Sequence, residues 1–361
     1  MKDVFFKQEE KALFSLRQLY RSYGYLPFKM NKFEEYDLYA KNKDFLIGDG
    51  VITFTDTNGK LLALKPDVTL SIIKNASDEK CTKNKVYYNE NVYRISGGTR
   101  EYKEIMQTGL ECIGDIDIYD TYEVVSLARK TLEAISDDYV LEISHMGVIF
   151  AILNKISDDK SFYEDALECI EKKSTHEIKA VCAKYGLNKE NEALLSTLAT
   201  LYGKPSDVIS RLETLDKEIG FGECLEELKT ICALLLKDGG FDKIRLDFSI
   251  VNDMKYYNGI VINGYINGIC ECVLYGGCYD KLLSKMGKGC RGMGFAIYTD
   301  LLGQLNSAKC GYDVDTLIIY SDNTSALAVK EAIEKEIASG KSVSAQKSIP
   351  KKLRYREIKE I

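Results

Sequence analysis

The chain has 361 residues, of which 45% are hydrophobic and 29% charged, and its net charge of −6 corresponds to a pI near 5.4. This length allows one large domain with an appendage or two domains, and the acidic balance argues against a surface that binds nucleic acid as a whole. The sequence has no apolar run of about 18 residues and no signal peptide, so we expect a cytoplasmic protein without a membrane span.

Cysteine and histidine usage limits the chemistry that the chain can carry. The eleven cysteines are scattered without a Cys-x-x-Cys pair, which favours reduced thiols that pack as small hydrophobic side chains. Only two histidines occur, His145 and His176, too few for a histidine-rich metal site or a conventional Ser-His-Asp triad. We therefore expect no metal and no cofactor, and a structural role for His145 at the end of a strand.

The first part of the chain predicts helices separated by hairpins. Residues 7–23 place leucines and tyrosines on one helical face, and Gly24 ends the pattern. Two apolar runs flank Asn58-Gly59, which is a strong hairpin signal. Asp67 can cap a helix that begins at the next residue. The elements predicted after it are two strands around a loop at 96–103, a helix that begins at Asp120 or Thr121, and a strand at 140–145.

Helical patterns dominate the middle of the chain, and strands return after it. The sequence pattern of residues 147–238 is helical almost throughout, and we expect a helical insertion at about 155–240. Because the strands come mostly as hairpins with long helices between them, we predict an α+β fold with a mainly antiparallel sheet. The remaining predicted elements are strands at 243–251 and in a 259–277 hairpin, helices at 279–286 and 295–305, a strand at 316–320, a helix at 325–340, a strand at 342–346 and a basic tail.

Residues 86–114 contain the most informative pattern. In the second half, alternation places Gln107, Gly109 and Glu111 on one face of a strand, with a glycine where a side chain would otherwise fill space. If this face is covered, the Glu111 carboxylate needs a cation beside it, and the amino group of a ligand is a candidate. Arg94 on the preceding strand, followed by a Gly-Gly loop, offers only some of the groups that a phosphate-binding site needs. The stretch therefore predicts an amino-acid pocket beside an incomplete phosphate site.

Two further fragments are candidates to complete this pocket. Asp67 and Thr69 flank a helix start, where backbone N–H groups converge. Tyr256 and Tyr257 lead into the 259–277 hairpin, and an aromatic ring there can close over a ligand. Each fragment also has a plain structural interpretation, as a helix cap or as core tyrosines, and spacing alone leaves both open.

Three other patterns are better explained by structure than by function. The Gly-x-Gly-x-x-Gly at 287–292 follows a helix and lacks a surrounding βαβ unit, so we predict a flexible loop rather than a dinucleotide site. The basic tail predicts a solvated or frayed terminus rather than an RNA or partner contact. Four cysteines, two of them on one face of a strand, predict buried structural thiols rather than zinc ligands: Cys270, Cys272, Cys278 and Cys290.

Several motifs together, in this order, carry a family resemblance: LALKPDVTLSIIKN, VYYNENVYR, EIMQTGLECIGD, MKYYNGIVINGY, GGCYDKLL and GMGFAIYTDLL. The chain resembles the histidyl-tRNA synthetase core over about residues 1–310, and still more its non-catalytic paralogues, the regulatory subunits of ATP phosphoribosyltransferase. The resemblance implies a class II aminoacyl-tRNA synthetase-like core, usually dimeric, with an antiparallel sheet flanked by helices. We accordingly predict a histidine-binding core at 1–311 that contains the helical insertion, and a truncated remnant of an anticodon-binding-like α/β domain at 312–361.

The resemblance also implies a histidine site. Asp67 and Thr69 match the family's L-R-P-E/D-x-T motif, and Gln107 and Glu111 match its Q-x-x-x-E strand, which faces the amino group of the ligand. Lys65 in place of arginine and Asp67 in place of glutamate leave the pose open. The implied histidine-binding residues are Asp67, Thr69, Arg94, Gln107, Glu111, Tyr256 and Tyr257.

Most groups that would handle ATP do not match. Ser96 stands at the acidic position of motif 2, Asn252 at the arginine of R-G-L-D-Y-Y, and Leu301 at the arginine of motif 3. Adenylation concentrates negative charge, and a lost stabilising donor costs roughly 2–4 kcal/mol of barrier. Asparagine and leucine cannot replace guanidinium groups, so we predict no catalytic residues.

These expectations combine into one functional hypothesis and two alternatives. The leading hypothesis is a catalytically silent histidine sensor in the first step of histidine biosynthesis, which activates the short-form ATP phosphoribosyltransferase and transmits feedback inhibition. The resemblance implies a hetero-octamer with that partner, built on dimers of this chain, and the truncated C-terminus argues against tRNA binding. A divergent histidyl-tRNA synthetase and a synthetase-like amino-acid-binding module of another pathway remain open as alternatives.

Overall fold

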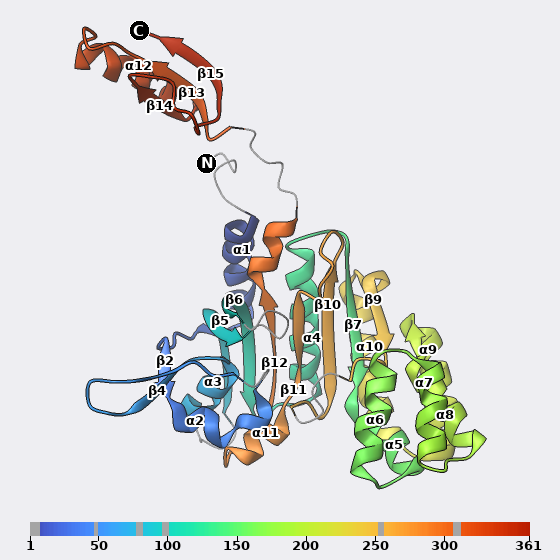
Figure 1. The fold of residues 1–361 in the computed structure, drawn as a ribbon. Helices are drawn as coiled ribbons and strands as arrows, with labels where there is room; N and C mark the ends of the chain where they lie inside the picture. Colours follow the sequence, from blue (N-terminus) through green and yellow to red (C-terminus); the bar gives the residue numbers. More distant parts are fainter. Residues whose placement is uncertain (1–7, 47–49, 77–81, 96–100, 252–255, 306–311) are drawn as a thin grey trace. The chain divides into compact units, whose positions relative to one another are not determined.

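A computed structural model of the 361-residue chain describes residues 8–46, 50–76, 82–95, 101–251, 256–305 and 312–361 (Figure 1). The chain divides into two units, Met1–Leu305 and Asn306–Ile361. The boundary predicted after Gly311 falls next to residues 306–311, which lie outside the described part, so its position stays a prediction.

The first unit is built on a nine-stranded sheet in the order β1-β5-β6-β12-β11-β10-β7-β9-β8. Only the pairs β1–β5 and β7–β9 are parallel among these described strands, which confirms the mainly antiparallel α+β fold. The strands are β1 (Leu26–Pro27), β5 (Lys83–Ile95), β6 (Tyr102–Gly114), β7 (Tyr139–His145), β8 (Tyr202–Gly203), β9 (Ile244–Asp247), β10 (Ile260–Ile266), β11 (Leu274–Cys278) and β12 (Arg291–Tyr298).

Helices cover both faces of this sheet. On one face, α4 (Ile118–Glu133) lies against β7, β10 and β12 and also contacts α1 (Gln8–Ser22), the amphipathic helix predicted at 7–23 (Figure 1). On the other face, α3 (Thr69–Asn75) contacts β6, and α11 (Asp280–Lys285) contacts β12. Strand alternation separates two cores, because Leu110 belongs to the first and Ile113 to the second.

A small antiparallel sheet, β2-β4-β3, precedes α3. Its β3–β4 hairpin turns at Asn58-Gly59 as predicted, and Gly59 has a φ of 82°, a left-handed conformation that favours glycine. The elements are β2 (Phe33–Glu35), α2 (Tyr36–Lys41), the 3₁₀ turn η2 (Lys43–Phe45), β3 (Thr53–Thr55) and β4 (Leu61–Leu64).

The helical block predicted at 147–238 is present and shares its core with the sheet. Phe162 and Leu228 in this block belong to the same apolar core as Leu127 of α4 and Ile143 of β7. Burial against the sheet therefore stabilises the block, since helices of this length are marginal alone. Its elements are α5 (Met146–Ile156), α6 (Lys160–Glu171), α7 (Thr175–Lys184), α8 (Lys189–Ala199), α9 (Pro205–Ile219), α10 (Gly222–Leu235) and the 3₁₀ turns η3 (Leu236–Asp238) and η4 (Phe241–Lys243).

Two element predictions in the first unit were wrong. The helix predicted at 295–305 is instead the end of strand β12 followed by the 3₁₀ turn η5 (Thr299–Gln304). Met293, Phe295 and Ile297 alternate with small residues, so a strand buried between β6 and β11 places them in the core. Helix α4 begins at Ile118 rather than near Asp120, because Asp117 caps it and Asp120 completes the capping box.

The prediction that four cysteines are buried holds for Cys272 and Cys278 and was wrong for Cys270 and for Cys290, which is only partly buried. Cys270 and Cys272 lie in the connection between β10 and β11 rather than on one face of a strand, and Cys270 is exposed.

The strand predicted at 243–251 is shorter in the structure, since β9 ends at Asp247.

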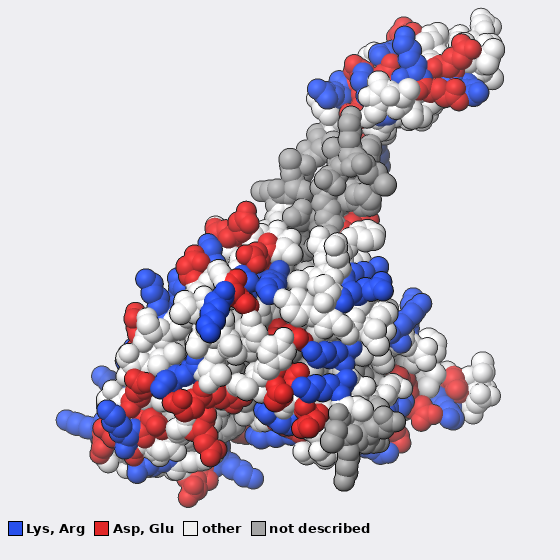
Figure 2. Space-filling view, turned by 180° about the vertical axis from the view of Figure 1, so that it is seen from behind, with Lys and Arg blue, Asp and Glu red and all other residues white. Residues whose placement is uncertain are grey.

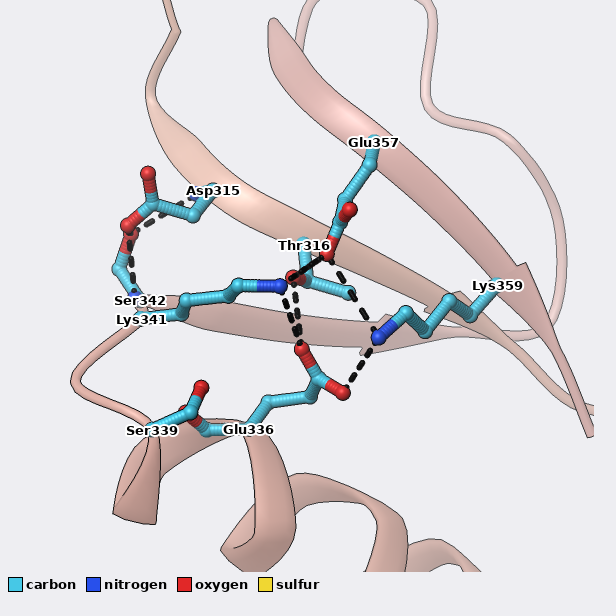
Figure 3. A network of polar contacts seen from close by, with 8 residues as sticks. All are labelled: Asp315, Thr316, Glu336, Ser339, Lys341, Ser342, Glu357 and Lys359. Carbon is cyan, nitrogen blue, oxygen red and sulfur yellow. Dashed lines mark hydrogen bonds and ion pairs between the residues drawn. The ribbon is translucent and has the colours of Figure 1, made fainter.

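The second unit is a three-stranded parallel sheet, β14-β13-β15, with one helix, α12 (Ala326–Ala338). The tail is not frayed at residues 355–360, which form β15 and pair along β13, although most residues of this strand are exposed, as the prediction of a solvated tail expects. Glu336 of α12 binds Lys341 and Lys359, and Lys341 also binds Glu357, so these two basic residues are neutralised within the unit (Figure 3). The strands are β13 (Val314–Ile319), β14 (Val343–Gln346) and β15 (Tyr355–Glu360).

The surface mixes charges of both signs. On the face shown in Figure 2, basic and acidic side chains are interspersed rather than gathered into a basic patch. Among the described residues, no helix combines the length and apolar character that crossing a bilayer requires.

Candidate functional site

The seven residues predicted for a ligand site lie around one pocket on the α3 and α11 face of the sheet. Residues far apart in sequence meet there because β5, β6, β12 and β11 are neighbours in the sheet. The cavity volume is about 60 Å³, several times the ~10–15 Å³ that one water molecule needs. The predicted residues in the lining are Asp67, Thr69, Arg94, Gln107, Glu111, Tyr256 and Tyr257.

Glycines in the strands create the space for this pocket. Gly294 of β12 pairs with Glu111 of β6, and a Cβ at Gly294 would lie 1.8 Å from Glu111 Oε2. Gly109, which the alternation placed between Gln107 and Glu111, lies beside Tyr88, whose hydroxyl would lie 2.6 Å from a Cβ there. Any side chain at either glycine would therefore displace a group that lines the pocket.

Glu111 is buried, and its two oxygens accept hydrogen bonds from hydroxyl groups. The Thr69 hydroxyl donates to Oε1 at 2.7 Å, and the Tyr279 hydroxyl donates to Oε2 at 2.6 Å. Burial raises the pKa of Glu111 to about 8, against the lowering effect of these two hydrogen bonds. Among the described residues no Lys or Arg forms an ion pair with this carboxyl group, so a cationic or N–H-bearing ligand group can supply the missing partner.

Asp67 supplies a second buried carboxyl group at the start of α3. Its Oδ1 accepts a hydrogen bond from the backbone N–H of Leu70 at 2.8 Å, so Asp67 serves the helix start as predicted although Val68 occupies the N-cap position. Burial raises the pKa of Asp67, while the Leu70 N–H and the Arg94 charge oppose that rise. The pocket thus contains two carboxyl groups whose charged forms are costly without a ligand.

Gln107 and Arg94 add polar groups to the wall. Gln107 is 3% exposed, and within the described part of the chain its amide has no hydrogen-bond partner. Arg94 Nε donates to the Pro66 carbonyl at 2.8 Å, and Arg94 Nη1 donates to the Tyr298 hydroxyl at 3.1 Å. The Gln107 amide can therefore donate a hydrogen bond to a polar ligand in the pocket or accept one from it.

Aromatic rings close the rest of the pocket, and four tyrosines among them were missed from the sequence. Tyr256 and Tyr257 pack edge to face with their centroids 4.8 Å apart, and Tyr256 lies 6.0 Å from Tyr279. Three of the missed rings lie on β5, β11 and β12, and the fourth caps α11, so finding them from the sequence would have required the strand order. The missed tyrosines are Tyr88, Tyr275, Tyr279 and Tyr298.

The three positions that do not match the charged groups of the synthetases are placed only in part. Leu301 packs against the main apolar core from η5 and does not line the pocket. Ser96 and Asn252 lie outside the described residues, so their correspondence to the synthetase positions stays a prediction.

His145 has a structural role in the described structure. The backbone N–H of Gly147 donates to Nδ1 at 3.0 Å at the start of α5, and Nε2 lies 3.1 Å from Glu227 Oε2. The 287–292 glycine motif follows α11 and leads into a strand, the reverse of the order that a dinucleotide fingerprint needs. Within the described residues no group of three or more His, Cys, Asp or Glu side chains is arranged to hold a metal ion.

Comparison with solved structures shows the fold. A structure titled as an ATP phosphoribosyltransferase regulatory subunit/histidyl-tRNA synthetase from Bacillus halodurans is similar with a TM-score of 0.78 and 23% identity, over 98% of this chain and 93% of that chain. The ATP phosphoribosyl transferase (HisG:HisZ) complex from Thermotoga maritima contains a chain similar with a TM-score of 0.64 and 20% identity, over 82% of this chain and 98% of that one.

Sequence comparison shows the family. The histidyl-tRNA synthetase family model matches residues 3–302. The ATP phosphoribosyltransferase regulatory subunit of Ruminiclostridium cellulolyticum is 24% identical over 96% of this chain and 85% of its own length. That of Caldanaerobacter subterraneus is 30% identical over 78% of this chain and 74% of its own length. The chain therefore belongs to the histidyl-tRNA synthetase family and, within it, to the ATP phosphoribosyltransferase regulatory subunits.

Proposed function

We propose that this chain binds L-histidine in the Glu111 pocket and, without catalysing a reaction itself, regulates a short-form ATP phosphoribosyltransferase catalytic subunit. The observation that carries the proposal is the pair of buried carboxyl groups, Asp67 and Glu111, in one small pocket. Histidine has N–H groups at its ammonium and at its imidazole, so each carboxyl group can accept a hydrogen bond from one of these two groups. The names of two relatives support ATP phosphoribosyltransferase as the enzyme that this chain regulates.

The same pocket is poorly equipped for adenylation. Leu301 stands at the position that resembles the motif 3 arginine, carries no charge and packs against the apolar core. Joining a carboxylate to an α-phosphate needs cations fixed at the developing negative charge. This supports a binding role rather than a synthetase activity.

The proposed partner is the short-form catalytic subunit, because a similar chain occurs in the HisG:HisZ complex from Thermotoga maritima. We propose a hetero-octamer with four copies of each subunit, assembled on dimers of this chain. Native mass spectrometry of the co-expressed subunits is expected to give that mass, and a complex of different stoichiometry would contradict the assembly while leaving the pocket untouched.

Substitution of Glu111 tests the histidine site. Glu111→Gln keeps the size of the side chain and removes the carboxyl group that can ionise beside a cationic ligand, and we expect the affinity for histidine to fall about 10- to 100-fold. Isothermal titration calorimetry with histidine, with ATP and with both measures this. Glu142→Gln is the matched control, because Glu142 is a partly buried carboxyl on β7 whose pKa burial raises to about 7 and which does not line the pocket.

The outcomes separate the alternatives. Unchanged histidine affinity in Glu111→Gln would contradict the proposed site. Tight ATP binding with histidine-dependent pyrophosphate exchange would support a divergent histidyl-tRNA synthetase instead. Histidine binding without any effect on the short-form phosphoribosyltransferase would leave a synthetase-like binding module of another pathway.

Regulation is tested in the complex. We expect this chain to raise the activity of the short-form catalytic subunit, and histidine to inhibit the complex through a coupling between the two sites. The complex with Glu111→Gln is expected to stay active and to need about 10- to 100-fold more histidine for inhibition. Inhibition at the wild-type histidine concentration would show that histidine acts elsewhere.

A further inference from the structure

Arg94 is a buried cation without an ion-pair partner in the described part of the chain. Its side chain is 8% exposed, and no carboxylate there lies within 4.0 Å of its guanidinium nitrogens. Buried charges in proteins are normally paired. Asp67 acts on Arg94 through its charge but forms no ion pair with it, and Arg94 lines the pocket, so an anionic group of a ligand can be its direct partner.

The Arg94 guanidinium is held by two contacts from different elements. Nε donates to the carbonyl of Pro66, just before α3, and Nη1 donates to the hydroxyl of Tyr298 at the end of β12. A guanidinium has five N–H donors in a rigid fork, so fixing two of them orients the rest. Among the described residues the remaining donors have no hydrogen-bond partner, so they can serve a ligand in the pocket.

Tyr298 is itself held in place. It pairs with Gln107 across the β12–β6 ladder, and its ring packs edge to face against Tyr275 with centroids 5.5 Å apart. The hydroxyl therefore has a defined position opposite Arg94, set by strand pairing and ring packing.

We propose that Tyr298 is a positioning residue, whose hydroxyl orients Arg94 to bind the carboxylate of the amino-acid ligand. Tyr298 would then make the pocket selective for an α-amino acid over the corresponding amine or alcohol, although the tyrosine itself does not contact the carboxylate. This inference rests on the proposed histidine binding and adds the residue that sets its selectivity for a carboxylate.

A ligand-based cycle tests the inference. Tyr298→Phe keeps the ring and removes the hydroxyl, and Tyr275→Phe is the matched control, since Tyr275 lines the same pocket and forms no hydrogen bond with Arg94. Calorimetry with L-histidine and with L-histidinol, in which a hydroxymethyl group replaces the carboxylate, measures each variant. We expect Tyr298→Phe to weaken histidine binding about 5- to 20-fold and histidinol binding less than twofold, and Tyr275→Phe to change the histidine-to-histidinol ratio less than twofold.

A second cycle uses histidine alone. In an Arg94→Gln background, Tyr298→Phe should no longer weaken histidine binding, because the tyrosine acts through the arginine. Equal losses for histidine and histidinol, or additive losses in the double variant, would overturn the positioning role and leave Tyr298 as a packing residue. Absence of histidine binding in the wild-type protein would instead overturn the proposed function, so the two failures are distinguishable.

Discussion

At the scale of single residues, the ionisation of Glu111 links the pocket to stability. Burial raises the pKa of this carboxyl group from 4.5 to about 8, so the folded protein holds a proton there that the unfolded chain has lost. The resulting stabilisation is complete below pH 4.5 and is lost as the pH rises through about 8. Ligand-free wild-type protein should therefore lose stability relative to Glu111→Gln between pH 6 and pH 9, by on the order of 2 kcal/mol.

Denaturant unfolding at the two pH values measures this difference. Glu104→Gln is the control, because hydrogen bonds from Tyr93 and Asn91 lower the pKa of Glu104 and it stays ionised throughout that range. A stability difference between wild type and Glu111→Gln that is the same at both pH values would show that Glu111 does not titrate there.

Also at the residue scale, Gly294 tests whether empty space is required beside Glu111. A Cβ in Gly294→Ala would lie 1.8 Å from Glu111 Oε2 and 2.5 Å from the Leu110 carbonyl oxygen. We expect at least a tenfold loss of histidine affinity and a loss of stability of about 1–3 kcal/mol from overpacking. Gly289→Ala is the matched control because a Cβ there meets no atom within 4 Å. Wild-type affinity in Gly294→Ala, measured by calorimetry, would contradict this geometry.

At the scale of elements, the docking of α12 on its sheet depends on charge. Glu336 is the buried residue of the helix and binds Lys341 at 3.2 Å and Lys359 at 2.5 Å (Figure 3). These lysines lower the pKa of Glu336, so its contribution is present above its ordinary pKa of 4.5 and is lost as the pH falls through the lowered value. Glu336→Gln should therefore speed amide exchange in β13 and α12 at neutral pH, and the difference from wild type should shrink at acidic pH.

Hydrogen-exchange mass spectrometry of peptides from residues 312–361 measures this effect. Glu334→Gln on the same helix is the control, since Glu334 is 60% exposed and its contact with Lys330 is 3.5 Å long. Equal exchange in both variants would show that the ion network does not hold α12 in place.

At the scale of the whole molecule, the pocket lies within one of the two units. Each of its lining residues belongs to Met1–Leu305, and the ion network of α12 belongs entirely to the second unit. A chain that ends at Leu305 is therefore expected to bind histidine within about twofold of the wild-type affinity, measured by calorimetry. A loss of tenfold or more would mean that residues 306–361 contribute to the site.

Local patterns in the sequence determined much of the fold. The alternation of Gln107, Gly109 and Glu111 determined which face of β6 carries the polar groups, and Asn58-Gly59 determined a hairpin. Motifs in order along the chain identified the family and the seven residues that share the pocket, whose role in binding histidine stays a prediction. These features depend on neighbours within a few residues, or on motifs that a whole family shares.

The tertiary structure alone decided which strands are neighbours. Placing β12 between β6 and β11 converts a sequence with helical features into a buried strand, puts Gly294 beside Glu111 and Tyr298 beside Arg94, and brings the Tyr279 hydroxyl to Glu111. Pairing of β15 with β13 likewise converts a basic tail into part of a sheet. The physical reason is that periodicity specifies the face of a strand, whereas strand order follows from burying apolar surface contributed by residues far apart in sequence.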